Sequence, residues 1–203
     1  MYLVGLDHRS RALYSTVTVM ISLPATVKVV NWTLTLLNGA MKWDLALLFA
    51  FSFILFFLGG GLTGMWLSHV ALNVSMHDTF FVVAHFHLMF SASTFAAIFS
   101  GIYYYFPALF GIKYSRLFGY MHLIYFTGGQ WMTFLPLFWI GYSGMPRRIH
   151  DYPAFMMGWH GMSSVGHLTT MISIVFFFLM LLDSHIERRV VVHNILGVPR
   201  WHK

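Results

Sequence analysis

Long apolar stretches separated by short polar segments dominate the pattern along this chain. Five of them, over residues 12–37, 44–68, 79–106, 117–142 and 163–182, are each long enough to cross a hydrocarbon layer, which takes about 20 residues. An isolated strand cannot cross lipid because its backbone groups would lack partners, so each stretch is predicted to be a helix. The pattern predicts an all-α, polytopic membrane helix bundle with five transmembrane helices, a single membrane domain over residues 1–203.

Composition agrees with a chain that lies mostly in a bilayer. Of the 203 residues, 58% are hydrophobic and 9% are charged, and the mean hydropathy is +0.70. Soluble domains carry about 25% charged residues, so an ordinary water-exposed fold is excluded and no room is left for a soluble domain. The absence of cysteine excludes thiolate metal ligands and leaves the redox compartment undetermined.

The basic excess is 12 Lys and Arg against 6 Asp and Glu, a balance that can indicate nucleic-acid binding. The distribution of the cations argues against that function, because they divide unequally between the two sides of the predicted bundle. The positive-inside rule then places the C-terminus in the cytoplasm or matrix and the N-terminus outside. On the C-terminal side lie Lys42, Lys113, Arg116, Arg188, Arg189, Arg200 and Lys203, and on the other side lie Arg9, Arg11, Arg147 and Arg148.

Residues 77–87, HDTFFVVAHFH, concentrate candidate chemistry at the start of the third apolar stretch. Their helix is expected to begin near Asp78, because a carboxylate favours a helix N-terminus, and to end at Pro107. His85 and His87 are two positions apart, which is about 200° around an α-helix. The two side chains therefore point to opposite faces, and one helix is predicted to serve two cofactors rather than one metal ion.

Two residues interrupt the first apolar stretch. Pro24 cannot donate to the carbonyl of Met20, so a bend is expected there. Lys28 lies near mid-bilayer, where an unpaired ammonium costs at least about 2.5 kcal/mol on insertion scales. Because Lys28 is too far from either end of the span to snorkel easily, it is predicted to be a buried lysine that faces water or a partner.

Arg147 and Arg148 are adjacent in the loop between the fourth and fifth spans, which is rich in Tyr and Trp. Interfacial anchoring or lipid headgroup contact is one interpretation. A pair of bidentate donors for carboxylates or phosphates is the other, and the residues alone do not decide between them.

Other polar and small residues in the spans favour structural roles. His122 is expected to be a hydrogen-bonded structural residue. The glycines of the second span are expected to let a neighbouring helix, or a flat cofactor, approach closely, with helix packing the favoured interpretation. These glycines are Gly59, Gly60, Gly61 and Gly64.

Imidazole is a usual axial ligand of haem iron, and two haems on opposite faces of one helix would fit His85 and His87. Cytochrome b bundles use another arrangement, with paired histidines several turns apart on one helix face, and this chain has no such pair within a span. A transporter with a buried Lys28 is a weaker interpretation, because it leaves the histidine pair unexplained.

Four motifs carry a family resemblance: HDTFFVVAHFH, GLTG at 61–64, LPATVKVVNW at 23–32 and SGMPRRIHDYP at 143–153. Together they closely resemble subunit I of cytochrome c oxidase, in the haem–copper oxidase superfamily. The resemblance runs from Met1 to about Glu187 and covers the last five helices of the family's twelve-helix core. It implies reduction of O2 to water coupled to proton pumping across the membrane in the respiratory chain.

The resemblance also implies roles for residues that bind haem A. His85 matches the axial ligand of the high-spin haem, where oxygen is reduced beside a copper ion. His87 matches one of two axial ligands of the low-spin haem. Arg147 and Arg148 match the pair that binds haem propionates.

Two further roles follow from the same resemblance. His77 and Asp78 match ligands of a magnesium ion, which a glutamate of subunit II completes. Lys28 matches the lysine of a proton pathway, although Ala25 stands where the family commonly has a threonine. Asn73 likewise replaces an aspartate of many members.

The copper ligands of the family precede the position of Met1, so this chain is not expected to be active by itself. The expected partners are an N-terminal portion of subunit I that carries the copper ligands, subunits II and III, cytochrome c as electron donor through subunit II, and the lipid bilayer, with no nucleic acid. A separately made partner would make this a split subunit, and the alternative is a sequence cut from a longer chain.

The resemblance places the chain in the mitochondrial inner membrane or, alternatively, a bacterial plasma membrane, with the N-terminus on the outer side and the C-terminus on the matrix side. Two alternative functions are a quinol oxidase of the same superfamily and a non-catalytic assembly or scaffold fragment. Retention of all the candidate ligands argues against the scaffold.

Overall fold

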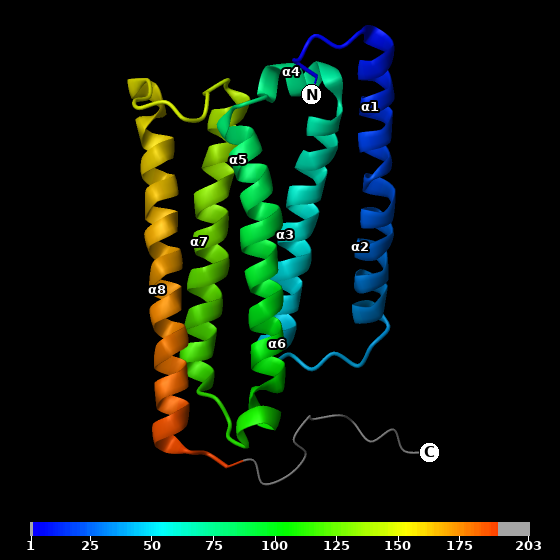
Figure 1. The fold of residues 1–203 in the computed structure, drawn as a ribbon. Coiled ribbons are helices and arrows are strands. Elements are labelled where there is room, and N and C mark those ends of the chain that lie inside the picture. Colours follow the sequence, from blue (N-terminus) through cyan, green and yellow to red (C-terminus); the bar gives the residue numbers. More distant parts are fainter. Residues whose placement is uncertain (1, 191–203) are drawn as a thin grey trace.

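The computed structural model describes residues 2–190, and these residues are almost entirely helical (Figure 1). In chain order the elements are α1 (His8–Met20), α2 (Ser22–Leu37), α3 (Leu45–Ser68), α4 (Val70–Met76), α5 (Phe80–Phe86), the π-helical η1 (His87–Ala92), α6 (Ser93–Phe110), α7 (Arg116–Tyr142), the 3-10 turn η2 (Ala154–Met156) and α8 (Met157–Glu187).

The first apolar stretch forms two helices in line, α1 and α2, divided at Ile21. The N–H of Ile21 bonds to the carbonyl of Thr18 at 3.2 Å, so the chain makes a tighter turn there. Pro24 supplies no N–H to the carbonyl of Met20, which weakens the helix at this point. The predicted bend is therefore present as a break between two helices at Ile21, three residues before the proline.

The third apolar stretch is one continuous column made of α5, η1 and α6. It begins near Asp78, as predicted, but the capping residue is Thr79, whose side chain accepts from the N–H of Phe81 at 3.3 Å. An N-cap residue has extended backbone geometry; Thr79 has it (φ −101, ψ 171), whereas Asp78 has a φ of 55.

The predicted end of this column at Pro107 is wrong. Pro107 lies inside α6, which continues to Phe110. The helix ends where Gly111 takes a left-handed φ of 67 and its N–H bonds to the carbonyl of Pro107 at 3.1 Å. A glycine in this conformation closes a helix without steric cost, so the glycine and not the proline ends the helix.

The predicted loop before the last span is shorter than expected. The span was predicted over residues 163–182, but helical structure begins at Ala154 in η2 and continues through α8 to Glu187. Polar and small residues in the first turns of α8 hide its start from a hydropathy pattern.

Four helical segments among residues 2–190 are long and apolar enough to cross a membrane: His8–Leu37, Leu45–Ser68, Phe80–Phe110 and Ala154–Glu187. These correspond to four of the five predicted spans. The remaining predicted span, residues 117–142, corresponds to α7, which has 27 residues but is not apolar enough to be counted with these four. Two of its polar side chains, His122 and Gln130, are buried. A membrane span at α7 stays a prediction.

The columns stand side by side, with α3, α6 and α7 between α2 and α8 (Figure 1). We call the end that carries α4, His77 and Asp78 the upper end, and the end that carries Lys42, Lys113 and Arg116 the lower end. The chain enters α1 at the upper end and leaves α8 at the lower end. The predicted tail cations Arg200 and Lys203 lie outside the described residues.

The helices of the bundle are held by aromatic and small residues. Phe49 of α3 stacks on Tyr103 of α6 with ring centroids 5.3 Å apart, and His122 of α7 lies 5.1 Å from Phe49. Between α7 and α8, a Cβ on Gly129 would lie 2.5 Å from the hydroxyl of Thr170. Small residues therefore bring these two helices into close contact.

Candidate functional site

His85 lies against α3. Its Nδ1 is 2.9 Å from the carbonyl oxygen of Gly60 and 3.1 Å from the hydroxyl of Thr63. A Cβ on Gly64 would lie only 2.9 Å from Cε1 of the imidazole. Gly60 and Gly64 therefore make room for side chains of the neighbouring column, Met89 and His85, as the packing interpretation predicted.

His87 lies against α7 instead. Its ring stacks on Phe134 with centroids 5.6 Å apart and an interplanar angle of 21°. Its Nδ1 is 2.8 Å from the carbonyl oxygen of Val83 on its own helix. The structure thus confirms that His85 and His87 point to different sides of one column.

The hydrogen bonds orient both rings. A carbonyl oxygen only accepts, so Nδ1 is the donor in His85 and in His87. The Nε2 atom of each ring makes no hydrogen bond within residues 2–190. Metal-binding histidines have this arrangement, in which a backbone acceptor holds one nitrogen and the other nitrogen is left for the metal.

The column changes its winding at this position. α5 ends at Phe86, and His87 begins the six-residue π-helical segment η1. Such segments are rare and frequently lie at functional sites. Nothing in the hydropathy pattern predicts η1, because its residues are as apolar as those on either side.

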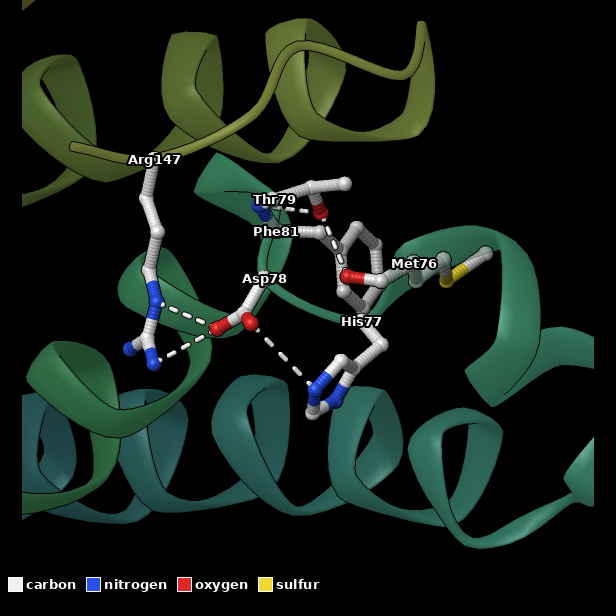
Figure 2. Close-up of polar contacts among 6 residues, drawn as sticks. All are labelled: Met76, His77, Asp78, Thr79, Phe81 and Arg147. Carbon is white, nitrogen blue, oxygen red and sulfur yellow. Dashed lines mark hydrogen bonds and ion pairs between the residues drawn. The ribbon is translucent and has the colours of Figure 1, made fainter. Parts of the chain in front are cut away.

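At the upper end, Asp78 and Arg147 form an ion pair between two loops (Figure 2). Arg147 donates to Oδ1 of Asp78 from Nε at 2.8 Å and from Nη2 at 2.7 Å. The main chains also meet, since the N–H of Arg147 bonds to the carbonyl of Asp78 at 2.8 Å. The loop before α5 and the loop after α7 are therefore joined at this point.

His77 completes this group. Its Nε2 lies 3.3 Å from Oδ2 of Asp78, the oxygen that Arg147 leaves free (Figure 2). Neighbouring Thr79 donates its hydroxyl to the carbonyl of Met76 at 2.6 Å, which fixes the backbone between α4 and α5. Within residues 2–190 no group of three or more His, Asp or Glu side chains is placed to hold a metal ion.

The remaining predicted residues are placed apart from this group. Arg148 is exposed and makes no hydrogen bond within residues 2–190, so it differs from its neighbour Arg147. Lys28 is exposed on α2, a helix without a buried residue. No described element covers that face of α2, so burial of Lys28 against a partner stays a prediction.

Two residues discussed from sequence have structural roles. His122 is fully buried, and its Nδ1 lies 2.9 Å from the hydroxyl of Tyr103, as expected for a hydrogen-bonded structural histidine. The side-chain amide of Asn73 donates to the carbonyl of Leu67 at 2.8 Å. An ionised aspartate at position 73 could not donate that bond, which explains an amide there.

Sequence reasoning missed Thr63 and Phe134 as neighbours of the two histidines. Thr63 lies inside the GLTG motif and carries the only hydroxyl in it, which was a usable signal. Phe134 had no signal, since it is one of 21 phenylalanines in the chain. Only the packing of α7 against the column places its ring beside His87.

Comparison with known proteins gives the family. The model of the family "Cytochrome C and Quinol oxidase polypeptide I" matches residues 1–178. The chain belongs to this family.

Relatives within the family are similar over the whole chain. Cytochrome c oxidase subunit 1 of Tetrahymena pyriformis is 69% identical over 203 residues, which are 100% of this chain and 29% of the relative. The same subunit of Paramecium tetraurelia is 56% identical over 203 residues, again 100% of this chain and 32% of the relative. The chain thus spans about three-tenths of the length of these curated relatives.

A solved structure supports the fold. A heme–copper terminal oxidase, determined by cryo-EM as a dimer, superposes with a TM-score of 0.75 at 18% sequence identity. The match covers 96% of this chain and 40% of that chain. The helical arrangement of Figure 1 is therefore the arrangement found in part of a heme–copper oxidase.

Proposed function

We propose that this chain forms the C-terminal part of the core of a cytochrome c oxidase and binds two haems through His85 and His87. The observation that supports this proposal is the pair of Nε2 atoms on two sides of one column that make no hydrogen bond within residues 2–190. The haem–copper family implies haem and copper as cofactors. Half-buried imidazoles with a free Nε2 are the donors that haem iron takes.

In this proposal His85 would hold the high-spin haem on the α3 side, and His87 would hold the low-spin haem on the α7 side. The two haems would supply electron transfer for the reduction of oxygen. The chain's own residues position the imidazoles: Gly60 and Thr63 fix the His85 ring, and Val83 fixes the His87 ring. The copper ligands come from outside this chain.

Charged side chains at the upper end would hold the anionic and cationic groups of the site. Arg148 is free to donate to a haem propionate, and Arg147 keeps donors besides the two that Asp78 uses. His77 and Asp78 would contribute to a magnesium site that a carboxylate of subunit II completes. Oδ2 of Asp78 faces His77 and is the oxygen open to a cation.

Lys28 would serve a proton pathway in the assembled core. Its exposed position on α2 fits a residue that further helices cover, since an uncovered ammonium in hydrocarbon is costly. The Lys28→Met variant should slow haem reduction before oxygen binds. Unchanged turnover in this variant would contradict a proton role.

The proposed partners are the rest of subunit I, subunits II and III, and cytochrome c as electron donor, in the mitochondrial inner membrane. The curated relatives are named as cytochrome c oxidase subunits, which favours cytochrome c over quinol as the donor. A dinuclear copper centre in the copurified subunit II would agree with cytochrome c, and its absence would favour quinol.

The test is made on the purified membrane complex that contains this chain. Pyridine haemochrome analysis should give two haems A per copy of the chain. His85→Ala should abolish the high-spin absorption and leave the low-spin centre largely intact, and His87→Ala should remove the low-spin centre. His167→Ala is the matched control, because His167 is an exposed histidine of α8, and both centres should survive in it.

Two results would contradict the proposal. A complex without haem would favour a scaffold function. Two unchanged haem centres in both the His85→Ala and His87→Ala variants would mean that the ligands were assigned to the wrong residues.

A further inference from the structure

A cavity of about 480 Å³ opens at the lower end, far from the histidines of the proposed haem site. Ligand pockets in proteins have volumes of roughly 300–1,000 Å³, so this cavity is large enough for a headgroup. Residues from three places in the chain form its walls: Lys113, Tyr114, Ser115, Arg116, Leu117, Phe118, Asp183 and Arg189.

The walls of this cavity are fixed by hydrogen bonds between segments far apart in sequence. The N–H of Lys113 bonds to the carbonyl of Arg189 at 2.8 Å, and the N–H of Ser115 bonds to the hydroxyl of Ser184 at 3.3 Å. The hydroxyl of Tyr114 donates to Asp44 at 2.8 Å. The loop between α6 and α7 is therefore held against the end of α8.

Positive charge dominates the lining. The lining contains three cations, Lys113, Arg116 and Arg189, and one carboxylate, Asp183. Arg189 is already paired with Glu187, at 3.0 Å from Nε and 2.9 Å from Nη2. Lys113 and Arg116 are exposed and make no ion pair within residues 2–190, so two cations are free to bind an anion.

Apolar side chains line the same cavity where α7 begins. Leu117 and Phe118 lie in the first turn of α7, and Leu117 is 68% exposed. Both α7 and α8 continue from here into the bundle (Figure 1). A ligand here would therefore have a charged group among cations and an apolar part along the helices.

We propose that this cavity binds the phosphate group of an anionic phospholipid, with Lys113 and Arg116 as its charged contacts. Lysine and arginine are the side chains that bind phosphate, and basic pockets between membrane helices are sites for anionic headgroups. Free phosphate would use the same cations. Leu117 and Phe118 in the lining favour a lipid, because free phosphate would make no use of apolar side chains.

Asp183 gives the proposal a second and opposite test. Its carboxylate lines the same cavity and repels an anionic headgroup. Removing its charge should strengthen lipid binding, whereas removing a cation should weaken it. A general loss of folding would not produce opposite effects in the two variants.

The experiment is native mass spectrometry of the purified oxidase complex that contains this chain, titrated with phosphatidylglycerol or with phosphatidylcholine. The complex should retain phosphatidylglycerol preferentially. Lys113→Gln combined with Arg116→Gln should weaken that retention by about fivefold for each cation removed. Asp183→Asn should increase it. Lys42→Gln is the matched control, because Lys42 is an exposed cation of the same end outside the cavity, and it should leave retention unchanged.

Three results would overturn the proposal. Equal retention in the double variant and in the Lys42→Gln control would show that the cavity does not bind the lipid. Equal retention of phosphatidylcholine and phosphatidylglycerol would show that negative charge is not recognised. Complete displacement of phosphatidylglycerol by inorganic phosphate at millimolar concentration would identify free phosphate as the ligand.

Discussion

Arg147 binds a single carboxylate oxygen of Asp78 through both Nε and Nη2, at 2.8 and 2.7 Å. The two residues are 69 positions apart in the chain. The pair joins the loop that carries His77 to the loop that carries Arg148. Any group bound by one loop therefore affects the position of the other.

Removal of this carboxylate should have a modest effect on stability. The Asp78 side chain is 56% exposed and that of Arg147 is 27% exposed, so we expect Asp78→Asn to lower the free energy of unfolding by about 1 kcal/mol or less. A double-mutant cycle with Arg147→Met measures the pair directly. If the two single effects simply add, the ion pair contributes nothing to stability.

Gly64 should tolerate no side chain, because His85 occupies the space. We expect Gly64→Ala to destabilise the assembled complex by about 1–3 kcal/mol and to shift the absorption of the high-spin haem, since the added Cβ would lie 2.9 Å from the imidazole. Thermal unfolding and the haem spectrum measure the two effects.

Gly61→Ala is the control for this prediction. A Cβ on Gly61 meets no atom within 4 Å, so the substitution should be neutral or stabilising by up to about 1 kcal/mol, as alanine is the better helix former. Equal effects at both positions would mean that contact with His85 is not the cause.

The buried pair of Tyr103 and His122 should be sensitive to removal of one partner. Tyr103→Phe leaves Nδ1 of His122 without its hydrogen bond, and Nε2 is already buried without a partner. We expect a loss of about 1–3 kcal/mol in the free energy of unfolding. Chemical denaturation in detergent measures it.

Replacing both partners should cost less than replacing one. In the Tyr103→Phe and His122→Leu double variant no polar atom is left buried, so stability should return toward that of the unmodified protein. A double variant less stable than Tyr103→Phe would show that His122 contributes something other than this hydrogen bond.

Tyr114 should make stability fall at high pH. Burial, together with its hydrogen bond to Asp44, raises the pKa of Tyr114 above its ordinary value of 10.0. A raised pKa means that the folded state keeps the proton longer than the unfolded state. The stabilisation is thus fully present below about pH 10 and is lost as the pH rises toward the folded pKa.

Unfolding measured between about pH 9 and 11 tests this dependence. Tyr114→Phe should remove the part of the pH dependence that comes from this group. The same slope in the variant and in the unmodified protein would assign that dependence to other residues.

The sequence by itself determined the helical class, four of the spans and the family. The thickness of the bilayer sets the length of an apolar helix, and lipid leaves the backbone no other partners, so these features do not depend on neighbouring helices. The helical period alone also predicted that the side chains of His85 and His87 point to different sides of the helix. The long motifs around them carried the resemblance that the comparisons confirmed.

Tertiary structure decided what the side chains contact. Aspartate is a typical capping residue, but Asp78 has a left-handed backbone and its side chain binds Arg147. Thr79 therefore caps the helix instead. Helix packing placed Gly64 against His85 and left Lys28 on an open face. Contacts between segments many residues apart depend on how whole helices pack, and hydropathy along one segment contains no information about its neighbour.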